Sequence, residues 1–351
     1  WATTIGRIPV RTVEDVKAYT DKIISYESQY PNSNFAKKII YTNTVNGSEP
    51  KVVRSWDDYL SKKWPGGQVL RFFHTKTPWD KTKPRDYPLS PGNWQKMING
   101  NQAGKMHMHG HGYLPAWILE GHKAVDAKVI DGLSNEHAYL VMTTVSCFTG
   151  QFDGQKDPSI TESILRAPKK GAVIAISPAR EGVPIFHKAS DYRLMVTEGK
   201  LDGTTETMTR FWINALKAKK DGTYRTAGES FYRTKQDMAK HAMKTAGYHW
   251  CQCELNFLGD PSLDLRALNP FTPDVTYPDS VILGQSKVKI TAGVAFSTVC
   301  LTKGQEIYQL HQTDERGELT VTLEPQTVGD ILLRVSGDSL NVFSGKIRVR
   351  K

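Results

Sequence analysis

MHMHGHG (residues 106–112) and YLVMTTVSCFTG (residues 139–150) are the two stretches that decide the fold of this chain. Each contains an apolar run of strand length that ends beside glycine, which predicts that His111 and Cys147 lie at the exits of two consecutive strands. Parallel α/β sheets place their active sites at the carboxyl ends of strands. A thiol and an imidazole presented there side by side form a nucleophile and its base.

The segments around these two strands alternate between helical and strand patterns. We expect helices over 13–26, 56–64, 90–98, 159–166, 205–219 and 229–245, and strands over 38–44, 69–74 and 171–177. Residues 115–120 are predicted to form a helix or a loop. This alternation predicts an α/β fold, with a mostly parallel sheet flanked by helices on both faces.

The pattern changes after a linker that holds Pro270, Pro273 and Pro278. Seven short strand patterns follow, over 281–283, 287–292, 297–302, 306–310, 318–323, 330–335 and 344–350. They predict a small all-β sandwich. We therefore divide the chain into an α/β domain over 1–268 and an immunoglobulin-like β-sandwich over 269–351.

Composition excludes several classes of protein. The chain has 351 residues and a formal net charge of +10, but no reader motif accompanies the basic residues, so we expect no nucleic-acid partner. No apolar run approaches the roughly 20 residues that span a bilayer. Four cysteines are too few for a disulfide framework. Cys251 and Cys253 are predicted to share one face of a strand, free or packed, and no paired cysteine spacing predicts zinc.

A lone cysteine or histidine is usually structural, but the placement of this pair favours cysteine acyl-transfer chemistry. His111 would take the Cys147 proton, and the sulfur would attack a carbonyl. The backbone N–H groups of Gly112 and Cys147 are the natural oxyanion donors. His109 is expected to line the substrate pocket, being two residues from His111. His107 and His109 do not predict a metal site, because ligands must converge from other elements.

The chain resembles the gingipain family of cysteine peptidases, relatives of caspases and legumain in the caspase-like group. The matching pieces run in order along the chain: IGRIP at 5–9, GHG at 110–112, SCFTGQF at 146–152, Glu162, the 171–177 strand and LGDPSL at 258–263. A trailing β-sandwich also fits that family.

The resemblance implies a cysteine endopeptidase that acts on proteins or peptides through a Cys147/His111 dyad, with Gly112 in the oxyanion hole. It implies that residues 177–184 form one wall of the pocket for the substrate residue before the scissile bond, the P1 residue. The pocket residues are then His109, Ser146, Ser177, Arg180 and Glu181. The resemblance also implies a preference for substrates with Arg or Lys at P1, and no required cofactor. Structural calcium is common in the family, and the sequence places no calcium or other metal site.

Two departures from the family pattern carry expectations of their own. His111 and Cys147 are 36 residues apart, which is longer than the family spacing and implies an insertion around 123–131. The chain starts after the acidic residue and the first strands that the family carries upstream. We therefore expect Trp1 to be an N-terminus made by proteolysis, possibly autocatalytic, with the upstream fragment bound and supplying a third catalytic acid. His109 stands where gingipains carry a small residue.

Two other functions compete with the endopeptidase. One is a non-catalytic or accessory scaffold of the same fold, which the presence of both His111 and Cys147 disfavours. The other is a peptide ligase or transpeptidase, in which an amine rather than water resolves the acyl-enzyme. Kinship implies a secreted or cell-surface protein. An intracellular location is the alternative, because the cysteines do not demand an oxidising compartment.

Overall fold

The computed structural model describes residues 4–30, 34–44, 56–58, 60–73, 85–119, 123–153, 156–182, 204–244 and 246–351. The chain divides into two compact units, residues 1–26 with 31–269 and residues 27–30 with 270–351. Two hydrophobic clusters belong to the first unit and a third to the second, so each unit has its own core.

The first unit is built on a seven-stranded sheet with the order β10-β9-β8-β4-β1-β2-β3. Its strands are β1 (Lys38–Asn43), β2 (Gln68–Phe73), β3 (Asp86–Pro88), β4 (Lys105–His109), β8 (Leu140–Thr144), β9 (Ala172–Pro178) and β10 (Leu255–Gly259). All neighbours pair in parallel except β10, which is antiparallel to β9. The predicted mostly parallel sheet is confirmed, and β10 is a strand that the sequence analysis missed.

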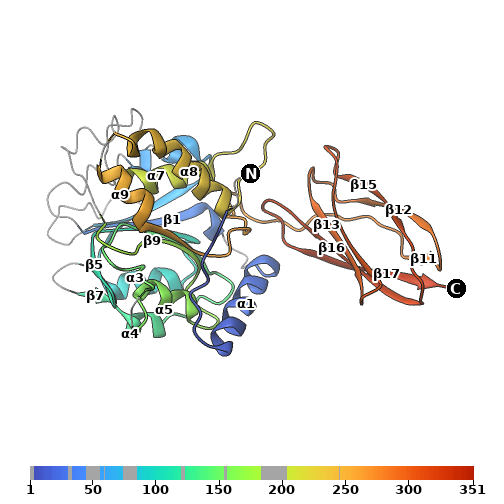
Figure 1. Cartoon of the computed structure of the whole chain (residues 1–351), viewed down its shortest axis with the longest axis horizontal. Coiled ribbons are helices and arrows are strands. Elements are labelled where there is room, and N and C mark those ends of the chain that lie inside the picture. Colours follow the sequence, from blue (N-terminus) through green and yellow to red (C-terminus); the bar gives the residue numbers. More distant parts are fainter. Residues whose placement is uncertain are drawn as a thin grey trace. The chain divides into compact units, whose positions relative to one another are not determined.

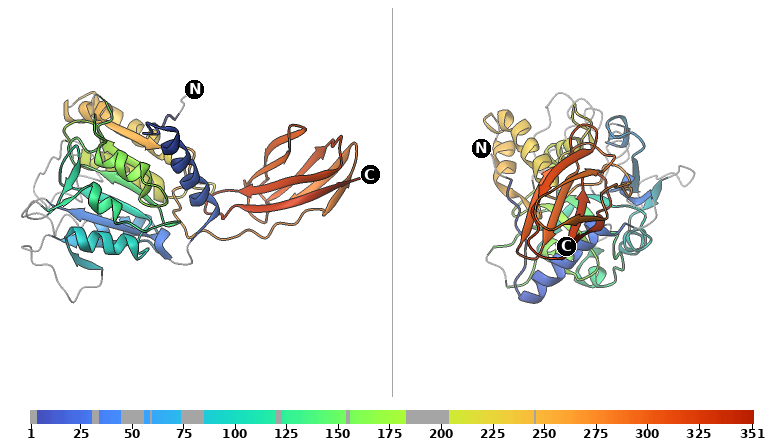
Figure 2. Two further views of the ribbon diagram at one scale, coloured as in Figure 1. Left: turned by 90° about the horizontal axis from the view of Figure 1, so that it is seen from below. Right: turned by 90° about the vertical axis from the view of Figure 1, so that its right-hand side faces the viewer.

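Helices cover both faces of this sheet (Figures 1 and 2). One side carries α3 (Pro91–Asn99), α4 (Ala127–Asp131) and α5 (Ile160–Arg166), and the other carries α7 (Thr204–Leu216), α8 (Ala227–Ala242) and α9 (Ala246–Glu254). The helix predicted at 13–26 is α1 (Val13–Ser28), and Thr12 accepts the Asp15 N–H at its start (3.1 Å). Residues 56–58 and 60–63 are also helical, and η1 (Asn34–Lys37) is a 3-10 turn. Within the described residues, no helix combines the length and apolar character needed to cross a membrane.

The residues of β4 alternate between the two faces of the sheet and are buried on both. Met106 and Met108 pack into the cluster that contains Trp94 of α3. His107 points to the opposite face, where its ring lies 5.7 Å from that of Trp56 and 5.1 Å from that of Tyr41. A central parallel strand must bury both faces, and β4 does so with two methionines and two histidines.

Two predictions near the histidine motif are corrected by the structure. The strand ends at His109, and His111 begins a separate strand, β5 (His111–Tyr113). Residues predicted as a helix or a loop instead include β6 (Ala116–Ile118), because Leu114 and Pro115 form a tight turn that closes a β5–β6 hairpin. The segment predicted as an insertion folds as β7 (Ala124–Val125), which pairs with β6, and α4.

The placement of Cys251 and Cys253 on a strand is wrong. Both lie in α9, where two residues of separation turn a side chain by roughly 200°. Cys251 is therefore buried while Cys253 is exposed. The short apolar run that follows, Leu255–Gly259, is the strand.

The second unit contains all seven predicted strands. They are β11 (Ser280–Ile282), β12 (Ser286–Thr291), β13 (Thr298–Lys303), β14 (Ile307–Gln312), β15 (Glu318–Leu323), β16 (Gly329–Ser336) and β17 (Phe343–Arg350). They form a five-stranded sheet, β11-β17-β16-β13-β14, and a two-stranded sheet, β12-β15. Alternate residues of both sheets, such as Val288, Leu301 and Leu333, share one buried cluster.

Lys22 of α1 is buried, with 1% of its side chain exposed, although it is charged in water. Its Nζ donates to the carbonyl oxygens of Ile164 (3.4 Å), Leu165 (2.6 Å), Lys170 (3.2 Å) and Ala172 (2.9 Å). Two of these carbonyls belong to the last turn of α5, where a helix leaves its acceptors unpaired. Lys22 therefore joins α1 to the end of α5 and the start of β9.

We predict that Lys22→Met lowers the free energy of unfolding by about 2–3 kcal/mol at neutral pH, because buried carbonyls lose their donor. Burial lowers the pKa of Lys22 to about 7 from 10.5 in the unfolded chain. Between these values the unfolded state binds more protons, so the wild type gains stability as pH rises, by up to about 1.4 kcal/mol per pH unit. The penalty of the substitution should grow from about pH 7 to pH 9 in denaturant titrations.

Lys17→Met is the matched control, because Lys17 is on the same helix with 76% of its side chain exposed and pairs with Asp21. We expect it to change the free energy of unfolding by less than about 1 kcal/mol. Equal penalties for the two variants, or a Lys22→Met penalty that does not change with pH, would contradict this account.

Candidate active site

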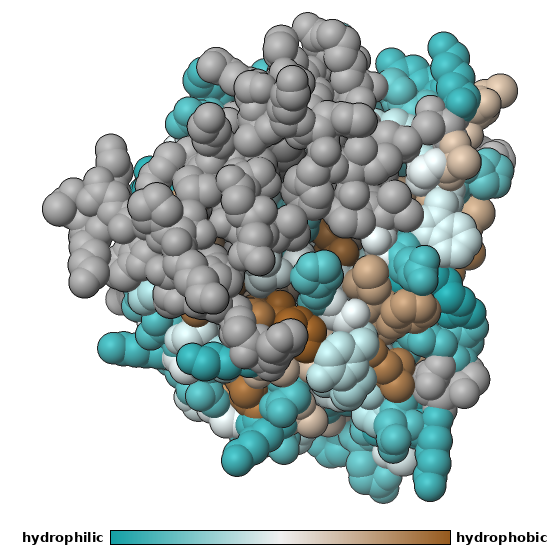
Figure 3. Space-filling view, turned by 90° about the vertical axis from the view of Figure 1, so that its left-hand side faces the viewer, coloured by the Kyte–Doolittle hydropathy of each residue, from teal (hydrophilic) through white to brown (hydrophobic). Residues whose placement is uncertain are grey.

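The candidate site lies where the order of the strands in the sheet reverses. After β1 the chain adds β2 and β3 on one side, then returns to place β4 on the other side of β1, followed by β8 and β9. Loops that leave two such strands diverge and open a crevice at their carboxyl ends. Thr44 follows β1, Gly110 and His111 follow β4, and Cys147 follows β8. Figure 3 shows this face of the molecule, where hydrophobic and hydrophilic residues lie intermixed.

Thr44 fixes the turn that carries His111. Its N–H donates to the carbonyl oxygen of His109 (3.0 Å), and its Oγ1 accepts the N–H of His111 (3.4 Å). Gly110 adopts a φ of +156°, and a Cβ there would lie 1.7 Å from Thr44 Oγ1. The turn therefore requires glycine at position 110.

Gly112 brings the hairpin that begins with His111 into contact with the loop that contains Cys147. A Cβ at position 112 would lie 2.5 Å from Thr149 Cγ2, 2.7 Å from Ser146 Cβ and 3.3 Å from the Cys147 carbonyl oxygen. The two backbones approach more closely than a side chain at 112 allows. This contact is what places the two candidate reacting residues in one site.

The Cys147 loop is held by the last residue of β9 and the segment that follows it. The N–H groups of Phe148 and Gly150 donate to the carbonyl oxygens of Arg180 (2.8 Å) and Pro178 (2.9 Å). Phe148 adopts a φ of +60°, a left-handed conformation that costs energy in a residue with a large side chain. This strain turns the chain sharply, directly after the sulfur.

Cys147 is partly exposed, and its Sγ lies 3.7 Å from the Gly182 carbonyl oxygen, to which the thiol donates. Burial is the main cause that raises the pKa of the Cys147 thiol above its usual value, and the carboxylates of Glu181 and Glu254 raise the pKa further. The sulfur is therefore held as a thiol in the resting state.

Two aromatic side chains, one beside the Cys147 loop and one beside His111, were not predicted from the sequence. Trp250 of α9, with 40% of its side chain exposed, donates from Nε1 to the Glu181 carbonyl oxygen (2.7 Å) and so fixes the residue before Gly182. Tyr113 is half exposed and stands two residues after His111, on the same side of β5. The exposure of an aromatic ring beside a strand end is the signal that could have identified Tyr113.

The predicted site residues fall into two groups. His111, Arg180 and Glu181 are at the surface, and Arg180 forms a two-point ion pair with Asp153 (2.9 and 2.5 Å). His109, Ser146 and Ser177 are at most 1% exposed, so they lie beneath the site rather than lining a pocket at its surface. Residues 183 and 184 of the predicted wall lie outside the described residues.

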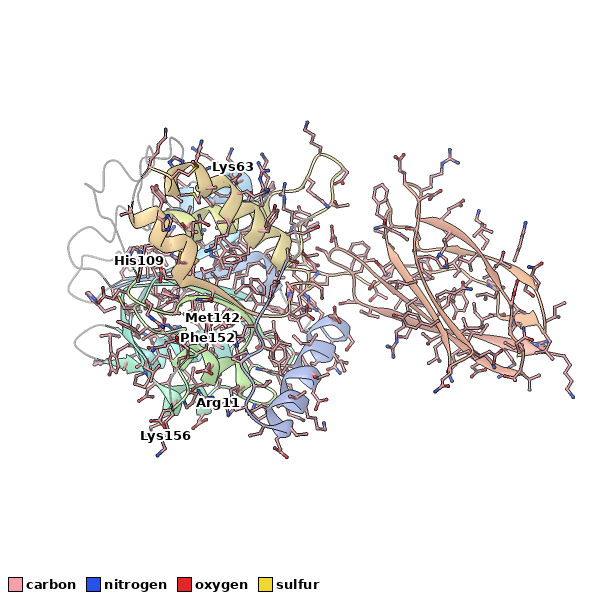
Figure 4. All side chains as sticks on the ribbon, viewed as in Figure 1. Arg11, Lys63, His109, Met142, Phe152 and Lys156 are labelled. Atoms are coloured by element: carbon pink, nitrogen blue, oxygen red, sulfur yellow. The ribbon has the colours of Figure 1, made fainter. Side chains whose placement is uncertain are left out.

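Two of the three side chains beneath the site, Ser177 and His109, have structural partners. Ser177 Oγ accepts from Thr161 Oγ1 (3.2 Å) and shares a hydrogen bond with Thr149 Oγ1 (3.1 Å), which ties β9 to the Cys147 loop. His109 Nδ1 lies 3.4 Å from Tyr41 Oη (His109 is labelled in Figure 4).

The buried histidines are neutral at neutral pH. Burial, followed by the charge of His111, lowers the pKa of His109 to about 4. Burial also holds the pKa of His107 well below its usual value. Among the described residues, no group of three or more histidine, cysteine, aspartate or glutamate side chains is arranged to hold a metal ion.

In the described part of the chain, no hydrogen bond joins the His111 imidazole to the Cys147 thiol. Catalytic hydrogen bonds are often long in unliganded sites and tighten when substrate binds. The arrangement presents an exposed imidazole and a half-buried thiol on adjacent elements. Such a pair can carry out nucleophilic chemistry with proton transfer.

The N-terminal segment of the unit reaches across to the same loop. The Arg7 guanidinium lies 4.3 Å from the Phe152 ring centroid, and the backbone of Arg7 pairs with Phe257 and Gly259 beside β10. Arg11 donates to both carboxylate oxygens of Glu162 (3.3 Å each) and to the Lys156 carbonyl oxygen (2.7 Å), on the lower side of the unit in Figure 4. Both arginines thus fasten the chain that leaves the Cys147 loop.

Comparison with known proteins agrees with this architecture. Residues 2–266 match the family model of Peptidase family C25. No curated protein matches the chain. The crystal structure of the Arg-specific cysteine proteinase gingipain R (RgpB) matches with a TM-score of 0.75 and 17% identity, over 99% of this chain and 75% of that one.

A complex of the Porphyromonas gingivalis RgpB pro- and mature domains matches with a TM-score of 0.72 and 17% identity, over 99% of this chain and 77% of that one. A structure described as a protease has a TM-score of 0.71 and 18% identity, over 97% of this chain and 73% of that one. At these identities the likeness shows the fold.

We predict that Glu181→Gln shifts the pH dependence of Cys147 alkylation by iodoacetamide to lower pH, by a few tenths of a pH unit. Removing a negative charge beside the sulfur lowers the cost of forming the thiolate. The shift should be largest at low ionic strength, because Glu181 is exposed and its charge is screened by salt. Peptide mapping would follow Cys147 separately from the other cysteines.

Glu136→Gln is the control, because Glu136 is an exposed glutamate that pairs with Lys169 away from the sulfur (3.3 Å). It should leave the alkylation profile unchanged. A shift to higher pH in Glu181→Gln, or equal shifts in both variants, would refute the role given to Glu181.

Proposed function

We propose that this chain, which belongs to Peptidase family C25 and is a cysteine-type peptidase, is an endopeptidase with a Cys147/His111 dyad. The observation that carries the proposal is the packing of Gly112 against Ser146, Cys147 and Thr149, which joins the hairpin of His111 to the loop of Cys147. Strand ends and flanking glycines in the sequence point to the same two positions.

The proposed reaction proceeds through an acyl-enzyme. His111 accepts the thiol proton as Cys147 Sγ attacks the carbonyl carbon of the scissile peptide. The C–N bond then breaks, and the amine leaves with the proton that His111 returns. A water molecule attacks the thioester, His111 takes a proton from it, and the carboxylic acid and the free thiol are released. The raised thiol pKa favours proton transfer during attack over a preformed thiolate.

The backbone N–H groups of Gly112 and Cys147 are proposed to stabilise the oxyanion. Tyr113 and Ala116 close the β5–β6 hairpin, and such a closing pair exchanges hydrogen bonds. The next pair, Gly112 with Trp117, is then of the non-hydrogen-bonded kind, so the Gly112 N–H points away from β6. In the described residues, the Cys147 N–H donates to no backbone carbonyl oxygen.

A basic residue at P1 is the proposed substrate preference. Glu181 and Glu254 both place negative charge near Cys147, and a cationic substrate side chain would offset it. The matching RgpB structure is described as Arg-specific, in accord with this preference.

An upstream segment is the proposed partner of this chain, as a processed fragment that stays bound. The support is the RgpB complex of pro- and mature domains, together with the family habit of an upstream acidic residue. The same kinship supports a secreted or cell-surface location. A structural calcium ion and a third catalytic acid remain proposals of the same kind.

We predict that an Arg- or Lys-directed acyloxymethyl ketone adds once to the wild type, at Cys147, as seen by intact-mass analysis. Cys147→Ala should take up no adduct. His111→Ala should react at least about 100-fold more slowly, because it loses its general base. Equal labelling of the wild type and Cys147→Ala would overturn the assignment of the nucleophile.

Product analysis separates the peptidase from its alternatives. Cleavage of a peptide in water with a carboxylate product supports hydrolysis. Transfer of the acyl group to an added amine as the main product would make the protein a ligase or transpeptidase. Absence of labelling and turnover with a broad peptide library would make it a scaffold.

We predict that Gly112→Ala lowers kcat at least about 100-fold, because its methyl group would collide with the Cys147 loop and displace an oxyanion donor. Gly92→Ala is the control, since a Cβ there meets nothing within 4 Å. Circular dichroism would confirm that both variants fold. A Gly112→Ala enzyme with wild-type kcat would exclude the close contact from catalysis.

A further inference from the structure

Strand β14 forms an open edge of the second unit. It pairs with β13 over six residues without a bulge, and it is the last strand on that side of the five-stranded sheet. β15 of the other sheet approaches it through one hydrogen bond, from Gln309 Nε2 to the Thr322 carbonyl oxygen (3.1 Å). Within the fully described second unit, no backbone hydrogen bond joins residues 307–312 to β15. Half of the backbone groups of β14 are thus left for another strand.

The edges formed by β11 and β12 in this unit are protected, and β14 is not. At the opposite edge, β11 has three residues. In the two-stranded sheet, β12 carries Lys287 and Lys289 at exposed positions. Short length and lysines are the devices by which natural sheets block edge pairing. The β14 sequence, IYQLHQ, contains no lysine, arginine, acidic residue or proline.

The outward side chains of β14 are apolar and exposed. Tyr308 is 76% exposed and Leu310 is 59% exposed, and both point to the outer face of the sheet. Across β13, in line with Tyr308, Leu332 of β16 is 41% exposed on the same face. Exposed apolar side chains therefore lie at the open edge and on β16, with Thr302 of β13 between Tyr308 and Leu332.

We propose that β14 pairs antiparallel with β14 of a second copy of this chain, so that two five-stranded sheets become one continuous sheet. The two-fold axis passes through Gln309, which faces its own copy. Tyr308 then lies opposite Leu310 of the partner subunit, and both pairs lie on the outer face. Aromatic–aliphatic pairs of this kind stabilise neighbouring strands.

A second copy fits this edge because the strand is complementary to itself. An antiparallel pair around a two-fold axis places each residue opposite itself or a near neighbour from the same strand of the other copy, and like charges on that strand would repel. β14 has none, whereas a self-paired β12 would bring lysines together. The proposal concerns the second unit and does not depend on the proposed peptidase activity.

Sedimentation velocity of the full chain, in a Cys147→Ala background that prevents self-digestion, tests the proposal. We expect a dimer to appear by about 100 μM, and Leu310→Lys to weaken it at least about tenfold in Kd. Ile282→Lys is the matched control, because Ile282 is 62% exposed on the short β11 edge, and the dimer should persist.

A monomer at every concentration up to about 100 μM would overturn the proposal, as would equal weakening by both lysine variants. The register has its own test. Gln309→Cys should form a disulfide-linked dimer on mild oxidation, identified by peptide mapping as a 309–309 bridge, because the Cα atoms of facing residues are within bridging distance. His311→Cys faces Ile307 of the partner subunit and should not form such a bridge; efficient bridging there would reject the register.

Discussion

The reversal of the strand order between β1 and β4 is the constraint on which the site depends. It opens a crevice at the ends of two strands, and the next strand, β8, delivers Cys147 beside it. The separation of the proposed base and nucleophile is therefore set by the backbone, through a strand spacing of roughly 4.8 Å and the contact of Gly112 with the Cys147 loop. The site needs no hydrogen bond between the two side chains to stay assembled in the absence of substrate.

Two lysines, Lys22 (buried) and Lys235 (partly buried), stabilise junctions between helices and strands of the first unit. Lys22 donates to the end of α5, and Lys235 donates to the carbonyl oxygens of Cys251, Gln252 and Leu255, where α9 passes into β10. Burial lowers the pKa of both side chains, to about 7 and about 8. The last carbonyls of a helix lack partners within the helix, so each lysine satisfies groups that an apolar residue would leave unpaired. The end of α9 lies next to the segment that holds the sulfur, because Leu255 pairs with Pro178, whereas the end of α5 lies at the opposite end of the sheet, where β9 begins.

Local patterns predicted most of the fold, and tertiary contacts account for what they missed. Five of the six parallel strands, most helices of the first unit and the seven strands of the second unit follow from period and from turn residues. β10 was missed because Leu255–Gly259 is a short apolar run that follows a helix without a turn signal. The sequence could not predict the burial of His109. A central parallel strand is buried on both faces, so no alternation of apolar and polar residues shows whether its last residue is buried or exposed. Trp250 acts on a segment 69 residues away in sequence, and no local pattern marks such a contact.

The pieces that carry the family resemblance meet in space around the Cys147 loop, and most of them have no reactive group. Gly6 fits against the Gly259 carbonyl oxygen, where a Cβ would lie 2.1 Å away, and this close approach places Arg7 over Phe152. Arg11 holds Glu162, whose carboxylate also caps the start of α5. These contacts fix both the exit of the Cys147 loop and the helix that follows it. A reacting sulfur must be positioned to a fraction of an ångström, so the residues that brace the Cys147 loop are under as strong a physical constraint as the proposed dyad. The residues that carry the family resemblance therefore include those that position the Cys147 loop as well as those proposed to react.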